Sequence, residues 1–478
     1  MLMTILAGTL NAQIPDFTPP TPLIAALMHN DTMEAKHLLE KGADPNEGRL
    51  LGFSPVFLSV IYQNKAIFDA IVAKSAAKRV DLQERDPWGS TLLMWAAFND
   101  KGNPEIVEEL LERGLDPNAT NKAGETALTW AVRRGSTAVV TALERAGASN
   151  QAVIRDAAQR SVTLLQKSGT QFVRVSGCVS CHHTFLPQMA AELARSRGLS
   201  VDEKTANMET AATIGMVKPV REELLRNPNK LPDPPVTLSY GLLSVAANHY
   251  PADEITDAMA QVIAKWQRPD GGFQSMPMRP PIEGSHFAAT ALSLRAMQLY
   301  GKDSGEQVRR AADWLRKAKP DTAEDAAMRL LGMSWAGAPI EELKAAVQSL
   351  LDQQRPDGGW AQLPGLETDA YATGQALVAL KWSGQVSASD AAYQRGLGFL
   401  LRTQYADGSW LVRSRSFPVQ PYKESGFPFG KDQWISAMGT SWASMALTLA
   451  LPEQKVALDA DSRLSSDVTT TGAAAGSR

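Results

Sequence analysis

The chain has 478 residues, of which 44% are hydrophobic and 21% charged, and its formal net charge is -3. This length allows two or three domains of ~150 residues, and the composition is that of a globular protein. The charge balance gives no basic surface for nucleic acid, and no run approaches the ~18 apolar residues of a membrane span. We therefore expect neither a nucleic-acid partner nor a membrane-spanning segment.

Residues 1–16 begin with the apolar run MLMTILAGTL, which gives way to small and polar residues. Such a run is typical of the core of a secretory signal peptide, although the basic leader is missing. We expect either a signal peptide or an apolar arm that packs on the next domain. The signal-peptide interpretation predicts an exported, periplasmic protein.

Residues 22–150 contain a repeat. WGSTLLMWAAF recurs as AGETALTWAV and more loosely as GFSPVFLSVI, and LLEKGADPN recurs as LLERGLDPN. Each unit predicts two short helices and a turn, and the pattern resembles the ankyrin repeat, whose period is ~33 residues. The resemblance implies about four copies stacked into a solenoid that binds a protein partner. A spacer that caps the following domain is the alternative.

Residues 151–177 are expected to form a linker helix, and a second repeat fills residues 178–451. In this repeat, amphipathic helices that end in the turns RPDGGF, RPDGGW and YADGSW alternate with six Ala-rich helices that are apolar nearly all round. A helix that is apolar on every side must be buried. The whole chain is therefore predicted to be all-α, with an ankyrin solenoid followed by an α/α toroid of about six helical hairpins. Residues 452–478 are small and polar and predict a disordered tail.

The toroid repeat also carries a family resemblance. RGLGFLLRTQYADGSW resembles the Gln-Trp repeat of squalene-hopene cyclase, and GTSWASMALTLAL resembles the closing inner helix of the same cyclases. The resemblance to the terpenoid cyclase and prenyltransferase superfamily covers about residues 178–451 and implies the toroid fold. It says less about activity, because one fold hosts many functions.

The acids of that superfamily are only partly present. Cyclases protonate an alkene with an Asp-x-Asp-Asp motif, whereas PDTAEDAAM offers Glu324 and Asp325 at a different spacing. Acids in the first turn of a helix are more often caps. Prenyltransferases hold zinc with Asp-x-Cys and a later His, but ETDAYATG has Asp369 followed by Tyr371, and no His follows residue 286. The enzyme alternative is therefore an isoprenoid or triterpene cyclase that uses Glu324, Asp325 or Asp369 as its acid.

The two cysteines of the chain lie in SGCVSCHHTF, where Cys178 and Cys181 directly precede His182. Cys-x-x-Cys-His is the attachment motif of c-type haem. Two thiols at this spacing reach two vinyl groups of one porphyrin, and the following imidazole reaches the iron. The sequence predicts a covalent haem c with His182 as an iron ligand, in a protein that transfers electrons or binds a hydrophobic small molecule. Zinc held by the same residues and His183, and a redox disulfide, are the alternatives.

The starts of the inner helices are expected to line one mouth of the toroid, which would hold His182, His183, His286, Glu324, Asp325, Asp369 and Ser441. His286 is the expected second iron ligand, because it opens an inner helix beside a Pro-rich loop. Met189, Met208 and Met216 are alternatives, whereas His249 is placed at the opposite rim. Residues 411–439 are rich in Pro, Gly and aromatics and predict a lid over the end that contains Cys178. A purely interacting protein without catalysis is the third alternative.

Overall fold

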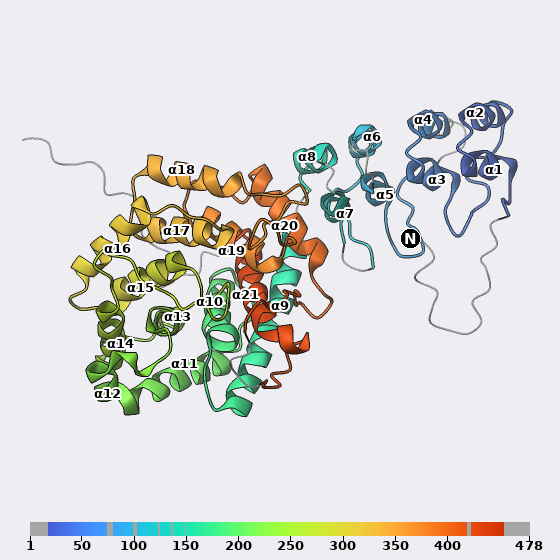
Figure 1. Ribbon diagram of the computed structural model, residues 1–478. Coiled ribbons are helices and arrows are strands. Elements are labelled where there is room, and N and C mark those ends of the chain that lie inside the picture. The colour runs from blue at the N-terminus through green and yellow to red at the C-terminus, as the bar shows by residue number, and fades with distance from the viewer. Residues whose placement is uncertain are drawn as a thin grey trace, which may run out of the picture. The chain divides into compact units, whose positions relative to one another are not determined.

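The computed structural model describes residues 18–73, 80–98, 103–122, 125–134, 137–148, 150–417 and 422–453. The chain divides into two compact units, Met1–Val153 and Ile154–Arg478 (Figure 1). Within the described ranges the regular structure is helical apart from two isolated bridges, so the predicted all-α class is confirmed. The expected leader, residues 1–16, and all but two residues of the expected tail lie outside the described residues.

In its described residues, the first unit has four pairs of short helices. Their bounds are α1 (Pro22–Met28) and α2 (Thr32–Glu40), α3 (Pro55–Ile61) and α4 (Lys65–Ala73), α5 (Leu92–Ala97) and α6 (Glu105–Glu112), and α7 (Ala127–Arg134) and α8 (Thr137–Arg145). Each pair packs on the next and shares one continuous apolar core, which includes Phe57, Phe68 and Leu110. No single pair has enough partners to bury its apolar side alone, so stacking is what stabilises the array.

The second unit is a closed ring of helical hairpins. Its inner helices are α10 (Leu186–Ser196), α13 (Pro234–Ala247), α15 (His286–Tyr300), α17 (Ala323–Trp335), α19 (Ala370–Trp382) and α21 (Gln433–Leu449). Each inner helix packs against the next, and α21 closes the ring by packing on α10. None of the helices in the described ranges has the length and apolarity that crossing a membrane requires.

The outer helices are α9 (Gln151–Ser176), α11 (Glu203–Val217) with the short α12 (Arg221–Arg226), α14 (Glu254–Lys265), α16 (Gly305–Lys317), α18 (Ile340–Leu351) and α20 (Ala391–Thr403). The segment that the sequence assigns to a linker, α9, packs as the outer helix of the first hairpin. The Gln404 side chain donates to the carbonyl of Ala157 at 2.9 Å and accepts from Arg160 at 2.8 Å. The ring therefore includes most of residues 151–177 as well.

The Asp-Gly turns end an outer helix and lead the chain to the next inner helix. Gly358 and Gly408 have φ of +94° and +93°, which a residue with a side chain rarely adopts. The aromatic residues that follow, Trp360 and Trp410, are buried. Their indole N–H groups donate to the carbonyls of Leu350 at 2.8 Å and Leu400 at 2.9 Å. Each indole is thus a second donor, beside a backbone N–H, to a carbonyl in the last turn of the preceding outer helix.

Candidate functional site

The Cys-x-x-Cys-His segment forms the entrance to the first inner helix. Cys181–Phe185 is a π-helical turn that continues directly into α10. Ser180 caps this turn, since its hydroxyl accepts the backbone N–H of His183 at 3.1 Å, and Gly177 with φ of +66° begins the loop before it. Isolated π-helical turns occur frequently at functional sites.

Both thiols are half-buried and free. Burial raises the pKa of Cys178, and it raises the pKa of Cys181 to about 12, with a small opposing effect from Arg279. Both groups are therefore protonated thiols at neutral pH. A redox Cys-x-x-Cys needs the opposite shift, toward the thiolate, so these surroundings do not favour the disulfide alternative.

The two histidines lie in an aromatic cage. His182 stacks on Trp434 with ring centroids 5.0 Å apart and planes 10° apart, and it meets the ring of Phe172 edge-on. His183 stacks on Phe172 at 4.9 Å and meets Phe427 edge-on. Burial lowers the pKa of His182 well below its usual range and that of His183 to about 3, because a positive charge is poorly solvated there. Both rings are therefore neutral at physiological pH, the form in which imidazole binds a metal.

A line of hydrogen bonds connects this cage to the chain's last hairpin. His183 Nε2 lies 2.8 Å from Ser425 Oγ, and Ser425 donates to Gln433 Oε1 at 2.5 Å. On the other side, His183 Nδ1 is hydrogen-bonded to His182 Nδ1, which also lies 3.2 Å from Ser180 Oγ. His182 Nε2 has no hydrogen-bond partner among the described residues.

The expected lid covers this end of the ring in part. Phe427 and Trp434 contact the histidines, and Phe429 packs on Phe427 and Tyr405. Phe417 and Tyr422 are 70% and 50% exposed. Residues 418–421 lie outside the described residues, and α21 begins at Gln433, so the end of the expected lid is helical.

Most of the residues expected at the mouth lie at the start of an inner helix, but Ser441 does not. That residue lies in the middle of α21, eight residues after the first residue of this helix, Gln433. His286 does open α15, where its Nδ1 accepts the backbone N–H of Ser275 at 3.3 Å. Asp233 accepts from the Ser275 hydroxyl at 2.8 Å, and its charge also acts on Cys181. No contact joins His286 to His182, so its role as second ligand stays a prediction.

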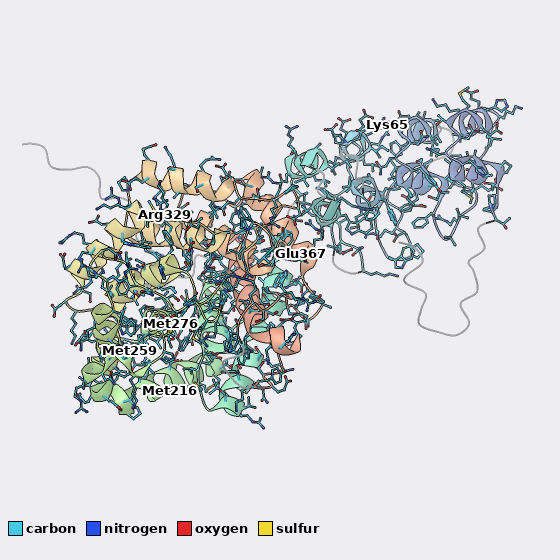
Figure 2. The ribbon with its side chains drawn as sticks, in the orientation of Figure 1. Lys65, Met216, Met259, Met276, Arg329 and Glu367 are labelled. Carbon is cyan, nitrogen blue, oxygen red and sulfur yellow. The ribbon has the colours of Figure 1, made fainter. Side chains whose placement is uncertain are left out.

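The methionine alternatives occupy different places. The Met216 sulfur accepts the backbone N–H of Val179, between the two cysteines, at 3.4 Å, and its side chain is 44% exposed (labelled in Figure 2). Met189 is buried within α10. Met216 is therefore the methionine with a direct contact to the motif, a contact that no sequence pattern indicated.

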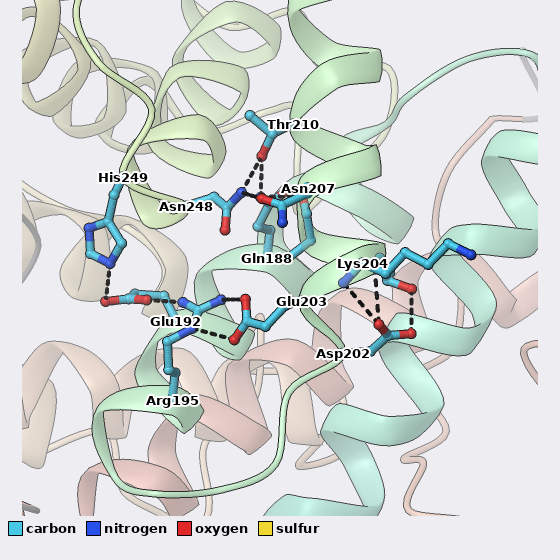
Figure 3. Close-up of polar contacts among 12 residues, drawn as sticks. Gln188, Glu192, Arg195, Asp202, Glu203, Lys204, Asn207, Thr210, Asn248 and His249 are labelled. Atoms are coloured by element: carbon cyan, nitrogen blue, oxygen red, sulfur yellow. Dashed lines mark hydrogen bonds and ion pairs between the residues drawn. The ribbon is translucent and has the colours of Figure 1, made fainter.

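His249 lies at the opposite rim, as expected. It follows the C-terminal end of α13, with its Nε2 at 3.4 Å from Glu192, and Figure 3 shows it facing the carboxylate of that residue in α10. Glu192 and Glu203 both pair with Arg195 there. This rim is a surface network of ion pairs.

The three candidate acids have different surroundings. Asp369 caps α19, where the backbone N–H of Ala372 donates at 2.9 Å, and burial raises its pKa to about 6. Asp325 lies in the first turn of α17 and accepts the Ser285 hydroxyl at 2.6 Å. Asp369 fits the capping interpretation, whereas the N-cap of α17 is Thr322 and the Asp325 carboxylate accepts from Ser285 and from the backbone N–H of Asp321.

Glu324 does not fit it, because its side chain is only 5% exposed. Tyr371, which replaces the prenyltransferase cysteine, donates to Glu324 Oε1 at 3.4 Å, while Oε2 has no partner. Burial raises the pKa of Glu324 to about 8, so the group is mostly protonated at neutral pH. The amide of Gln375 and the indole of Trp442 are buried in the same region, where Gln375 acts on the Glu324 carboxyl and Trp442 on the Tyr371 hydroxyl.

The described residues bring no three His, Cys, Asp or Glu side chains together in a metal-binding arrangement. The zinc alternative, which needs four ligands in a structural site and at least three from protein in a catalytic one, therefore has no coordination shell in the part of the chain described.

Comparison with known proteins bears on the first unit. Residues 72–153 match the family model for ankyrin repeats in three copies. The chain is 33% identical over 128 residues to palmitoyltransferase AKR1 of Lachancea kluyveri, which is 27% of this chain and 17% of that protein. It is 31% identical over 135 residues to neurogenic locus notch homolog protein 1 of Danio rerio, which is 28% of this chain and 5% of the relative.

A third relative is the inactive serine/threonine-protein kinase TEX14 of Bos taurus, 29% identical over 153 residues, which is 28% of this chain and 10% of that protein. The chain thus spans less than a fifth of the length of each of these relatives. The likeness establishes ankyrin repeats, a type of array through which proteins bind other proteins.

Proposed function

We propose that the second unit binds a haem covalently through Cys178 and Cys181, with His182 as an iron ligand. The observation that carries this proposal is the state of His182, a buried neutral imidazole with a hydrogen-bonded Nδ1 and an Nε2 that has no partner. Two protonated thiols at the attachment spacing precede it directly. Bound haem would supply one-electron transfer or a site for a small ligand on its iron.

The protein's own residues would then anchor and shield the group. The two thiols would become thioethers, and the stacked Trp434 and edge-on Phe172 would hold the imidazole plane of His182 and keep water from it. His286 is the proposed second ligand and Met216 the alternative. Because haem is attached outside the cytoplasm, the proposal includes export to the periplasm, with the ankyrin array binding a protein partner there.

The test is expression of the full chain together with a periplasmic haem-attachment system. We expect an absorption spectrum with a Soret band that stays with the polypeptide after denaturation, and its loss in the Cys178→Ser/Cys181→Ser double variant. Ser414→Ala, an exposed serine outside the motif, is the control and should keep the band. A wild-type chain that is exported with both thiols free and without a Soret band would contradict the proposal. Bound zinc, or a disulfide, would support one of the alternatives instead.

A second candidate function is supported by Glu324. A buried carboxylic acid that stays protonated near neutral pH, with one oxygen unpartnered, is suited to donating a proton. This favours an isoprenoid-type cyclase with Glu324 as the acid. Asp369 is a weaker candidate because it caps α19, and Asp325 because its carboxylate accepts the Ser285 hydroxyl.

Incubation with squalene and shorter linear isoprenoids tests that candidate. We expect cyclised product with the wild type and with the control Asp325→Asn, and none with Glu324→Gln. If no substrate is converted, the remaining candidates are a haem protein or a purely interacting one, and the haem spectrum separates these two.

A further inference from the structure

We propose that Gln433, Ser425 and His183 form a relay that fixes the tautomer of His182, so that Nε2 carries the lone pair presented to the iron. The inference rests on the proposed haem site and deepens it. The three residues would not touch the haem, so they are positioning residues. Their role follows from the direction in which each hydrogen bond must run.

The donor and the acceptor of each hydrogen bond can be assigned in turn, beginning with the side-chain amide of Gln433. Its Nε2 lies 3.0 Å from the carbonyl of Lys423, which can only accept, so the amide nitrogen must occupy that side. The amide oxygen therefore faces Ser425 Oγ at 2.5 Å. Because that oxygen can also only accept, the hydroxyl proton of Ser425 is committed to Gln433.

Ser425 can then only accept from His183, whose Nε2 lies 2.8 Å away. His183 therefore carries its proton on Nε2. The ring is buried between Phe172 and Phe427, where a cation is poorly solvated, so it holds one proton and its Nδ1 has a lone pair.

The last link joins the two imidazoles. His182 Nδ1 is in hydrogen-bond contact with His183 Nδ1, so one proton must lie between them. Because His183 Nδ1 has none, the proton belongs to His182, and the hydroxyl of Ser180 at 3.2 Å also faces it. A neutral His182 protonated on Nδ1 has its lone pair on Nε2. The opposite tautomer would bring two lone pairs together.

The relay also gives the lid a function. A ligand imidazole that donates its second N–H is oriented and made more basic by the acceptor. Here the acceptor is a second imidazole that is held from the lid and the start of α21. We therefore expect changes in Ser425 to alter the iron's surroundings although this residue lies two side chains away from the ligand.

The first measurement uses the haem-free full chain with ¹⁵N-labelled histidine, in which long-range nitrogen–proton spectra distinguish the tautomers. His182→Gln identifies its signals among the six histidines of the chain. We expect Nδ1–H in the wild type. Ser425→Ala removes the acceptor of His183, and Gln433→Leu frees the Ser425 proton to donate to His183, so both should shift His182 toward Nε2–H. The loss of one hydrogen bond predicts a change of roughly fivefold or more in the tautomer ratio.

The matched control is Ser414→Ala, an exposed serine of the same segment, which should leave the signals unchanged. In haem-loaded protein, Ser425→Ala should also raise the reduction potential, because the ligand becomes less basic. A wild-type His182 protonated on Nε2, or equal tautomer ratios in all three variants, would overturn the relay even if haem is attached. Failure of haem attachment with the tautomers as expected would instead contradict the proposed function and leave the relay standing.

Discussion

Closure of the ring depends on a glycine at the contact between its last two inner helices. A Cβ at Gly374 of α19 would lie 2.5 Å from the backbone nitrogen of Ala443 and 2.5 Å from the carbonyl carbon of Trp442, both in α21. These are backbone atoms of a buried helix and cannot turn aside as a flexible side chain can. Gly374→Ala therefore has to push the two helices apart.

The expected result is a net loss of stability. In an open helix, Gly→Ala stabilises by ~1 kcal/mol, because alanine has less backbone freedom to lose. Overpacking of a core destabilises by ~1–3 kcal/mol, and a contact with two backbone atoms belongs in the upper part of that range. We expect Gly374→Ala to lower the free energy of unfolding of the second unit by about 1–2 kcal/mol.

The assay is urea unfolding followed by circular dichroism and tryptophan fluorescence, with the midpoint compared at constant slope. The matched control is Gly215→Ala in α11, where an added Cβ would meet nothing within 4 Å. That variant should be equal to or more stable than the wild type. If Gly374→Ala stabilises as much as Gly215→Ala does, α19 and α21 are not in backbone contact and the close approach described here is wrong.

Three further predictions concern single polar groups. Trp410→Phe keeps a buried aromatic ring but removes the indole donor of the Leu400 carbonyl, which keeps the backbone N–H of Gln404, so it should destabilise by ~0.5–1.5 kcal/mol in the same urea assay. Glu324, whose pKa is raised by burial to about 8, stays protonated in the folded chain while it ionises in the unfolded one. The stability of the wild type should therefore fall as pH rises from about 4.5 to 8, and Glu324→Gln should fall less; equal pH dependence would contradict the buried acid. Asp86→Ala removes a carboxylate that accepts the Trp95 indole N–H at 2.9 Å, so the first unit should melt at lower temperature in calorimetry, and an unchanged melting temperature would show that this bond contributes nothing.

The ring could be predicted because its signals are local. In α19 every residue from Ala370 through Leu380 is buried, and the sequence of this helix is apolar on all sides. A helix with apolar residues on all sides needs neighbouring elements on all sides. The Asp-Gly-aromatic turns mark where each outer helix ends. Both features lie within a dozen residues, so neither depends on knowing which distant segment packs where.

The difference between Glu324 and Asp325 could not be predicted in the same way. Both residues stand in the first turn of α17, where either could cap the helix. What separates them is the neighbour that each meets, Tyr371 of α19 for one and Ser285 before α15 for the other. Helical periodicity gives the face of a side chain but not the identity of the helix opposite, so burial of Glu324 emerges only with the ring.

The site around His182 depends both on local sequence signals and on packing between distant segments. The thiols and His182 lie within five residues, so their spacing is complete in the unfolded chain and could be recognised from the sequence. The groups that orient His182 come from the other end of the ring, since Trp434 and Ser425 precede or begin α21, the helix that closes on α10. Attachment of a cofactor to the motif would need only the local segment. The geometry of its ligand would be set only when the last hairpin docks on the first, because before that step His183 has no acceptor for its Nε2 proton.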